Sequence, residues 1–348
     1  MRSAEGQQVP AEALAGELLE GMSLPAFLLD RTEQVVAANA GALALLGQAL
    51  PGRNLAFFLR AAELFEAITA VRADGEPRDV VLRLPGETQY EARVSLVQSL
   101  GQVLCVLRDI SRETQNEVIR RDFVANVSHE LRTPLTAMMG FIETLQTTAK
   151  GDPAAHQRFL SIMEREAARM NRLVSDLLQL SRVEASERMR PREEIDLVQV
   201  LQSVIATVRG RAEEAGGSIL LERPEALETL LPGDADQLTQ VFLNLTENAV
   251  KYGAKGALVR LVLSREMTSR GRALRVDVID QGEGIDPVHL PRLTERFYRI
   301  DSHRSRAEGG TGLGLAIVKH IINRHRGWLK IDSRQGEGST FTVLLPQK

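Results

Sequence analysis

The chain has 348 residues, enough for two or three domains of ordinary size. Hydrophobic residues make up 43% and charged residues 26%, which is typical of a soluble globular protein, and the net charge of −3 argues against nucleic acid as a partner. With one cysteine, Cys105, the chain cannot form an intrachain disulfide or a cysteine-rich metal cluster, which fits a reducing compartment.

The sequence has no run of about 18 apolar residues, the length that a membrane-spanning helix needs. The N-terminus, MRSAEGQQVPAEALAG, lacks the basic start and the apolar core of a secretory signal. We therefore expect a cytoplasmic chain without a membrane segment. The sequence leaves open whether a native membrane anchor has been removed.

Residues 1–20 are rich in Ala and Glu and are expected to form a short amphipathic or loose lead-in. Residues 21–110 form the first predicted domain, in which short strand and helix patterns alternate. Two helices are predicted, AGALALLG and AAELFEAITAV, and the predicted strands are PAFLLD, VVAAN, DVVLRL, YEARVSLV and GQVLCVLRDI. These patterns predict a small α+β domain, with Cys105 packed in its last strand.

Residues 111–187 contain two long helical patterns separated by KGDPAA. The apolar residues of each helix fall close to one seam, which Glu166 interrupts in the second helix. Two antiparallel helices cannot bury such seams alone, so we predict a four-helix bundle formed by a homodimer, with a hairpin packed on the rest of the chain as the alternative. The seam residues are Phe123, Val127, Leu131, Met138, Ile142, Leu145, Phe159, Met163, Met170, Leu173, Leu177 and Leu180.

A third domain is predicted for residues 192–348, entered through a linker at 191–198. Helices are expected at 195–217, 234–253 and about 312–325, in blocks between mostly antiparallel strands. This order predicts a two-layer α/β sandwich. The expected strands are SILLE, ALVRLVLSREM, RALRVDVID, WLKIDS and STFTVLLP.

Three motifs in this domain point to a nucleotide. In NLTENAVKY, Asn244, Asn248 and Lys251 share one helical face, where amide oxygens can bind a hard cation and the lysine can face phosphates. In DVIDQGEGI, Asp280 ends a strand and can accept a hydrogen bond from an exocyclic amine, while the glycines that follow let a planar ring come close. Each motif alone is also typical of a solvated helix face or a glycine-rich turn.

The third motif, EGGTGLGLAIVKHI, places Gly309, Gly310, Gly312 and Gly314 before a helix. Free backbone N–H groups and the positive end of the helix dipole favour phosphate there. The motif is neither a P-loop nor a dinucleotide fingerprint. The preceding segment, HLPRLTERFYRIDSHRSRAEGG, is expected to form a mobile lid. Together, the order and spacing of the three motifs predict an ATP site.

The motifs NLTENAVKY, DQGEGI, ERFYR and GGTGLGL, followed by QGEGSTF, resemble the N, G1, F and G2 boxes of the sensor histidine kinase ATP-binding domain. The resemblance implies that ATP and Mg²⁺ bind, with Asn248 as the Mg²⁺ ligand. It also implies that Asn244 and Lys251 contact the phosphates and that Asp280 contacts adenine. The other residues implied to line the nucleotide site are Tyr252, Gly282, Gly284, Tyr298, Arg299, Gly310, Thr311, Gly312, Leu313, Gly314 and Thr340.

The stretch FVANVSHELRTPLTAMMGF interrupts its apolar seam with a histidine. His129 lies about 200° around the helix from Val127 and from Leu131, so it is expected to point out of the seam. An exposed imidazole is largely neutral at cellular pH, and Glu130 can hold its Nδ1 proton while Nε2 attacks a phosphorus atom. A solvent-facing histidine usually has no such role, and we assign none to the other five.

SHELRTPL resembles the phosphoacceptor H box of dimeric histidine kinases, so the resemblance extends from about residue 112 to the C-terminus. It implies that His129 is autophosphorylated, that Glu130 is the base, and that Thr133 positions the water that dephosphorylates a response regulator. Pro134 is expected to kink the helix. We therefore predict a cytoplasmic, homodimeric sensor histidine kinase that passes phosphate from ATP through His129 to an aspartate in the receiver domain of a separate regulator.

Residues 21–110 resemble a PAS sensor domain, at which a ligand or an upstream regulatory protein would act. GFIETLQ and HLPRLTERFYRID resemble phosphate-regulon sensor kinases, which implies phosphate-starvation signalling. The alternatives are a signal-gated response-regulator phosphatase or binding module with little kinase activity, and a kinase of another pathway. An ATP-driven clamp of the chaperone or topoisomerase type would need long segments after the ATP domain.

Overall fold

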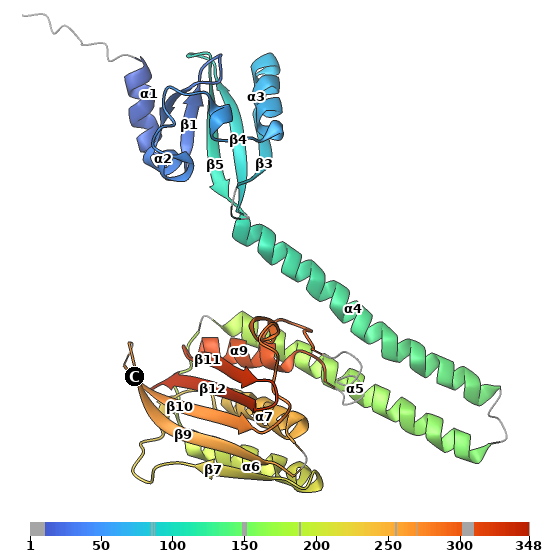
Figure 1. Ribbon diagram of the computed structural model, residues 1–348. Coiled ribbons are helices and arrows are strands. Elements are labelled where there is room, and N and C mark those ends of the chain that lie inside the picture. The colour runs from blue at the N-terminus through green and yellow to red at the C-terminus, as the bar shows by residue number, and fades with distance from the viewer. Residues whose placement is uncertain are drawn as a thin grey trace, which may run out of the picture. The chain divides into compact units, whose positions relative to one another are not determined.

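The computed structural model describes residues 11–84, 86, 88–147, 152–187, 189–254, 256–269, 271–300 and 310–347 (Figure 1). The chain divides into two compact units, which meet between Ala125 and Asn126 within one long helix. Among the described residues, no helix combines the length and the apolar character needed to cross a membrane.

The N-terminal unit is built on a five-stranded antiparallel sheet with the strand order β2-β1-β5-β4-β3. All the strands and helices predicted for 21–110 are confirmed. The core includes Phe27, Ile68 and Cys105, which are fully buried. The elements are β1 (Ala26–Leu29), β2 (Val35–Ala38), α2 (Ala40–Leu46), η1 (Leu55–Phe57), α3 (Ala62–Asp74), β3 (Arg78–Arg83), β4 (Gln89–Val97) and β5 (Gln102–Asp109).

Part of the expected lead-in is a helix, α1 (Ala11–Glu20), that packs on this unit. Leu19 is buried in a small cluster with Ala26 and Leu28 of β1. The buried Asn39 amide donates hydrogen bonds to three backbone carbonyls at and after the end of α1, among them that of Leu19. Helix α1 is therefore part of the sheet-based unit, and residues 1–10 of the lead-in lie outside the described residues.

Helices α4 (Ser111–Gln146) and α5 (Pro153–Ser186) are the two long helices that the sequence predicts. Helix α4 continues through Pro134. The rings of Phe141 and Phe159 stack with their centroids 5.4 Å apart, which pairs the end of α4 with the start of α5. Residues 148–151 of the connecting loop lie outside the described residues.

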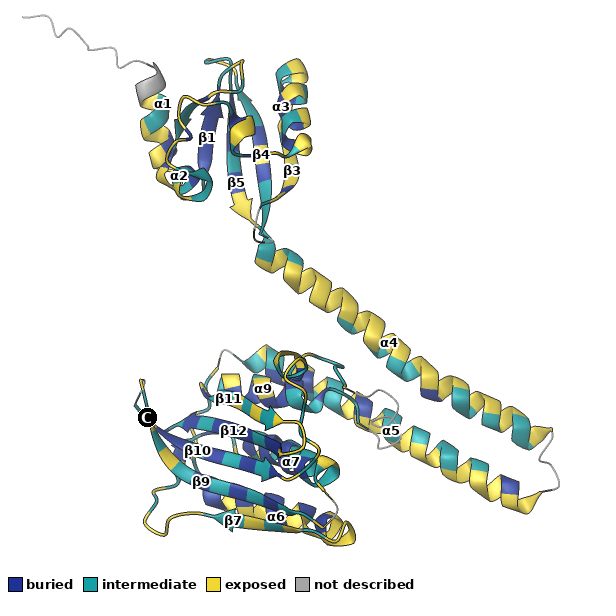
Figure 2. Ribbon diagram, in the orientation of Figure 1, coloured by how far each residue is buried: buried dark blue, intermediate teal, exposed yellow. Residues whose placement is uncertain are grey.

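Much of the hairpin surface is exposed (Figure 2), and some of its exposed residues are apolar. Most of the predicted seam residues are only half-buried. A set of apolar residues, which includes the predicted seam residue Ile142, is exposed, and the surface of a stable helix pair rarely tolerates this in water. In the second unit this set comprises Leu135, Met139 and Ile142 of α4 and Leu160, Val174 and Leu178 of α5.

The rest of the second unit is the predicted two-layer α/β domain. Its five-stranded sheet has the order β11-β12-β10-β9-β7, with only β7 and β9 parallel. The elements are α6 (Leu197–Glu214), β7 (Ser218–Glu222), α7 (Ala235–Tyr252), β9 (Leu258–Thr268), β10 (Gly271–Asp280), η2 (Leu290–Arg292), α9 (Gly314–Arg324), β11 (Trp328–Arg334) and β12 (Gly338–Pro346).

The predicted linker at 191–198 is shorter than expected. Its residues Glu194–Asp196 form strand β6, which pairs with an unpredicted strand, β8 (Leu230–Pro232). Helix α6 begins directly afterwards, because the Asp196 carboxylate caps it by accepting a hydrogen bond from the Val198 amide. The domain therefore starts within the segment that the sequence suggests is a linker.

Candidate functional site

Helix α7 presents one buried and one polar face. Phe242 and Leu245 are fully buried in the core of the domain, whereas Asn244 and Asn248 are half-buried on the other side. The Asn244 amide accepts a hydrogen bond from Gln240 at 3.2 Å and donates to the Gly314 carbonyl at 3.3 Å, which links α7 to the start of α9. The Asn248 amide makes no hydrogen bond with the described residues, so its oxygen is available to a ligand.

The end of α7 contacts the loop after β10. The Lys251 ammonium lies 4.8 Å from the ring centroid of Tyr252, which is 46% exposed. A Cβ on Gly282 would overlap the Tyr252 carbonyl oxygen, so the loop can approach the helix only with glycine at this position. The structure thus brings the first two sequence motifs together.

Asp280 ends strand β10 and is almost fully buried. Its Oδ1 accepts hydrogen bonds from the Gly282 amide at 2.8 Å and the Ser339 amide at 3.2 Å. Burial raises the pKa of this carboxyl, and the hydrogen bonds oppose that shift. Sequence analysis did not identify Ser339, although it lies within QGEGSTF. The two amides fix the orientation of the carboxylate.

The backbone around Asp280 is packed against strands β11 and β12. Gly284 has φ of +68°, and a Cβ there would overlap the Arg334 carbonyl. Gly338 is opposite Arg334 in the sheet, and a Cβ there would overlap the Asp280 carbonyl in the same way. Thr340 follows on β12, half-buried and paired with Ile279.

Residues 310–314 lead into helix α9, as predicted. Gly312 has φ of +74° and packs directly on Phe297, whose amide donates to the Gly312 carbonyl at 2.9 Å. Leu313 is fully buried, and no described side chain caps α9, which leaves its first N–H groups for an anion. Gly309 and the rest of the predicted lid at 301–309 lie outside the described residues.

Tyr298 and Arg299 lie between this loop and η2. The Tyr298 hydroxyl is 2.7 Å from Nδ1 of His289, and the Arg292 guanidinium lies 4.3 Å from the Tyr298 ring centroid. Arg299 is half-buried. Tyr298 is thus tied to residues around η2, and its contact with a nucleotide stays a prediction.

Helix α5 contacts the α/β domain through a row of carboxylates that sequence analysis did not identify. Asp176 accepts a hydrogen bond from the Thr311 hydroxyl at 2.7 Å, and burial raises the pKa of this carboxyl. Further along, Glu184 pairs with Arg296 at 2.5 Å, and Glu187 lies 2.9 Å from His320 on α9. These acidic residues recur at helical spacing, a pattern that also fits a solvated face.

The phosphoacceptor motif lies on α4. His129 is exposed, as predicted, and the exposed Thr133 donates its hydroxyl hydrogen to the His129 carbonyl at 3.1 Å. Glu130, the predicted base, does not share this exposed side. Its side chain is 16% exposed and its carboxylate lies 2.6 Å from the Arg169 guanidinium on α5. Adjacent helical residues point about 100° apart, which lets one face solvent and the other face the partner helix.

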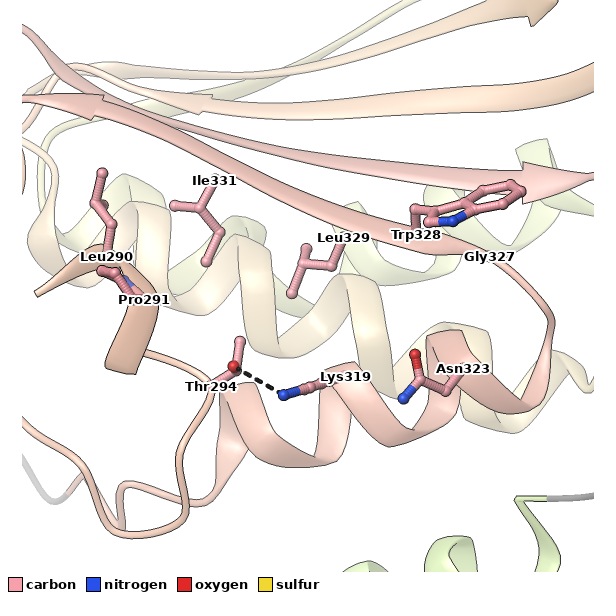
Figure 3. Close-up of a pocket in the computed structure, with 9 residues that line it drawn as sticks. All are labelled: Leu290, Pro291, Thr294, Lys319, Asn323, Gly327, Trp328, Leu329 and Ile331. Carbon is pink, nitrogen blue, oxygen red and sulfur yellow. Dashed lines mark hydrogen bonds between the residues drawn. The ribbon is translucent and has the colours of Figure 1, made fainter. Parts of the chain in front are cut away.

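A cavity of about 430 Å³ lies at the edge of the sheet, between η2, α9 and β11 (Figure 3). Its wall is mainly apolar, and Lys319 crosses it to within 3.5 Å of the Thr294 hydroxyl. None of the predicted nucleotide-site residues lines this cavity, so it is separate from the site described above. Its lining residues are Leu290, Pro291, Thr294, Lys319, Asn323, Gly327, Trp328, Leu329 and Ile331.

Two families match the chain in the regions where these groups lie. Residues 233–348 match the family described as histidine kinase-, DNA gyrase B-, and HSP90-like ATPase, and residues 119–186 match the His Kinase A (phospho-acceptor) domain. The phosphate regulon sensor protein PhoR of Pseudomonas aeruginosa is 35% identical over 338 residues, covering 90% of this chain and 74% of that protein. This chain belongs to the sensor histidine kinase family.

The chain is also similar to a second sensor kinase and to a solved histidine kinase structure. The sensor-like histidine kinase SenX3 of Mycobacterium tuberculosis is 39% identical over 240 residues, which cover 69% of this chain and 57% of that protein. The crystal structure of the histidine kinase ThkA in complex with the response regulator protein TrrA matches with a TM-score of 0.53 and 20% identity, over 95% of this chain and 98% of that one. At that identity the match shows a shared fold.

Proposed function

We propose that this kinase moves the γ-phosphoryl group of ATP to Nε2 of His129 and then to an aspartate of a response regulator. The observation that carries the proposal is the exposed His129 within the segment that matches the phospho-acceptor family. The likeness to a phosphate regulon sensor supports phosphate-starvation signalling as the pathway. Transfer to a separate regulator is supported by the fold shared with ThkA, which was crystallised with TrrA.

The nucleotide is proposed to bind between α7, the end of β10 and the start of α9. Asp280 accepts a hydrogen bond from the adenine amino group, since its carboxylate is buried and oriented by two amides. Lys251, Asn244 and the uncapped N-terminus of α9 bind the phosphates. Gly282, Gly284 and Gly312 pack directly against the backbone of neighbouring segments, so larger residues would not fit at these positions. This close packing holds the segments around the proposed nucleotide site together.

The described residues fit Mg²⁺ in one particular way. They contain no group of three His, Cys, Asp or Glu side chains that could bind a metal alone. Mg²⁺ commonly takes one or two protein oxygens and completes its shell with water and nucleotide phosphates, and the Asn248 amide oxygen can be such a ligand. When bound, Mg²⁺ would neutralise charge on the phosphates during transfer.

In the proposed reaction the Nε2 lone pair of His129 attacks the γ-phosphorus. A P–N bond forms while the bond to the bridging β,γ-oxygen breaks, and ADP leaves with that electron pair. Glu130 is the proposed base that holds the Nδ1 proton of the imidazole. In the second step, an aspartate oxygen of the regulator takes the phosphoryl group from His129. Thr133, one turn away on the exposed side, is proposed to position water when the regulator is dephosphorylated.

We also propose that this kinase is a homodimer and that its N-terminal unit is a sensor domain. The exposed apolar residues of α4 and α5 support a homodimer in which two hairpins form a four-helix bundle. The α+β unit before α4 is proposed to be a PAS-like sensor that receives a ligand or a protein signal. Its five-stranded sheet with α2 and α3 agrees with that architecture.

The test is incorporation of acid-labile phosphate from γ-labelled ATP in wild type and in His129→Gln. The variant should bind ATP like wild type and incorporate no label. His156→Gln, an exposed histidine on α5 of the same hairpin, is the matched control and should be labelled normally. Label retained at full level in His129→Gln would contradict the assignment. A phosphotransfer profile against candidate regulators would test the proposed pathway. Strong preference for a regulator unrelated to phosphate starvation would contradict it.

A further inference from the structure

The ion pair between Arg169 and Glu130 is unusually enclosed for a pair on a two-helix hairpin. The two side chains are only 11% and 16% exposed, and the Arg169 nitrogen lies 2.6 Å from the Glu130 carboxylate. A second carboxylate, that of Glu166, lies 3.8 Å from the other guanidinium nitrogen. A charged hydrogen bond of this length and enclosure is stronger than an exposed ion pair.

The ion pair of Glu130 affects the neighbouring residue, His129. His129 is exposed, whereas the carboxylate of Glu130 is directed into the contact with α5. A general base must lie within hydrogen-bond reach of the proton that it holds. The Glu130 carboxylate is paired with Arg169 on α5, so the base proposed for phosphorylation is engaged in an ion pair.

We propose that Arg169 is a positioning residue that withholds Glu130 from His129, and that release of this ion pair makes the base available for autophosphorylation. The inference rests on the proposed function and adds a control to it. Arg169 touches neither ATP nor the imidazole in this scheme and acts only through the Glu130 side chain.

The pair is suited to such control because its two halves lie on different helices. A small shift or rotation of α5 against α4 lengthens the contact between Arg169 and Glu130 without moving His129 along its own helix. Once released, the Glu130 side chain can rotate toward solvent, where its charge is hydrated, so release leaves no buried unpaired carboxylate. Glu166, one turn before Arg169, can then accept the guanidinium.

A structural role alone makes a different prediction. If the pair only stabilises the hairpin, its loss lowers activity and thermal stability together, whatever residue is at position 130. If Arg169 withholds the base, its loss raises the rate, and the rise depends on the Glu130 carboxylate. The two cases separate in a double-mutant cycle.

The experiment measures initial rates of autophosphorylation against ATP concentration for Arg169→Gln, Glu130→Gln and the double variant of the full chain. We expect Arg169→Gln to raise kcat by about three- to tenfold and to leave KM for ATP unchanged. That rise is the size expected when one partly enclosed ion pair biases the equilibrium between paired and released Glu130. In the Glu130→Gln background the same substitution should change kcat less than twofold. A change of about that size is the error within which independent substitutions add.

Three further variants complete the design. Arg169→Lys keeps a charge without the planar fork and should give an intermediate rate, and it covers the case in which Arg169→Gln does not fold. Arg165→Gln, an exposed arginine one turn away on α5, is the control and should match wild type. His129→Gln reports the proposed function independently, since wild type must be labelled in a His129-dependent manner. With that satisfied, a fall or no change in kcat for Arg169→Gln, or an equal rise without Glu130, overturns the inference.

Discussion

Thr311 of the glycine-rich loop donates a hydrogen bond to Asp176 of helix α5, with 2.7 Å between the oxygens. The Thr311 hydroxyl has one hydrogen to donate, so while it is engaged with Asp176 it cannot donate to a nucleotide phosphate. Burial raises the pKa of the Asp176 carboxyl, which means that the charged form carries a desolvation cost in this contact. If Thr311 contacts the phosphates as proposed, its hydrogen bond to Asp176 competes with nucleotide binding in this kinase.

Removing the acceptor should strengthen nucleotide binding. For Asp176→Ala we expect ATP affinity to rise by about two- to tenfold, the range for one hydrogen bond, because the loop and its hydroxyl are released. Thr311→Val loses the same contact but also the hydroxyl, and should show no gain. Isothermal titration calorimetry measures both. Glu164→Ala removes an exposed carboxylate from the same helix and should match wild type. Weaker binding by Asp176→Ala would show that the contact supports the nucleotide-binding form.

The buried Asp280 carboxyl should make nucleotide affinity depend on pH. Its pKa is raised above the ordinary 3.8 by burial, so on acidification it takes up a proton at a higher pH than an exposed aspartate does. The protonated group has lost part of its acceptor capacity, and affinity for ADP should therefore fall as pH drops through the raised pKa. Above that pKa the cost of burying the charge lowers stability, so Asp280→Asn should unfold at a higher temperature than wild type without nucleotide.

Titrations of ADP at several pH values would check this relationship. Asp280→Ala should weaken binding by about 10- to 100-fold, as expected for a hydrogen bond to a charged group, and remove most of the pH dependence on the acid side. The ADP phosphates titrate too. Their contribution is the pH dependence of ADP affinity that remains in Asp280→Ala. Parallel pH profiles for the two proteins would mean that Asp280 does not bind the base.

Much of the fold follows from local patterns. The strands of both sheets and the long helices are predicted because apolar residues repeat with periods of about 2 and 3.6 over long enough runs. Helix α7 illustrates this, since the pattern that buries Phe242 and Leu245 also places Asn244 and Asn248 on the opposite side. Strand β8, with only three residues, carries too short a pattern and was not predicted.

Contacts between distant residues could not be predicted in the same way. A carboxylate on a helix surface gives the same pattern whether it faces water or a partner, so neither Asp176 nor Glu130 revealed its partner. Those partners lie 135 and 39 residues away in the sequence. Ser339 was missed for another reason, because its contribution to the site is a backbone amide, which any residue type could supply.

Cys105 should be chemically silent in the native protein. Its side chain is fully buried on β5, and burial raises the pKa of the thiol to about 12, so almost no thiolate exists at neutral pH. We expect no alkylation by iodoacetamide under native conditions and one modification per chain after denaturation, measured by intact mass. Stoichiometric native modification would indicate that the α+β unit opens readily, for example as part of signal reception.

Two glycines in the second unit should respond to alanine in opposite ways. Gly284 has φ of +68°, and a Cβ would overlap the Arg334 carbonyl, so Gly284→Ala should destabilise the protein by more than about 1 kcal/mol and weaken ATP binding with it. Gly210 lies exposed within α6, and its Cβ would meet open space. Alanine there should stabilise by about 0.5–1 kcal/mol and leave ATP binding unchanged.

Urea unfolding followed by circular dichroism, together with titration of a fluorescent ATP analogue, would measure both variants. The comparison separates a general effect of added methyl groups from the specific overlap at Gly284. If Gly284→Ala unfolds and binds like wild type, the loop after Asp280 can move away from β11 without cost. The close approach of these two segments would then not be what positions the Asp280 carboxylate.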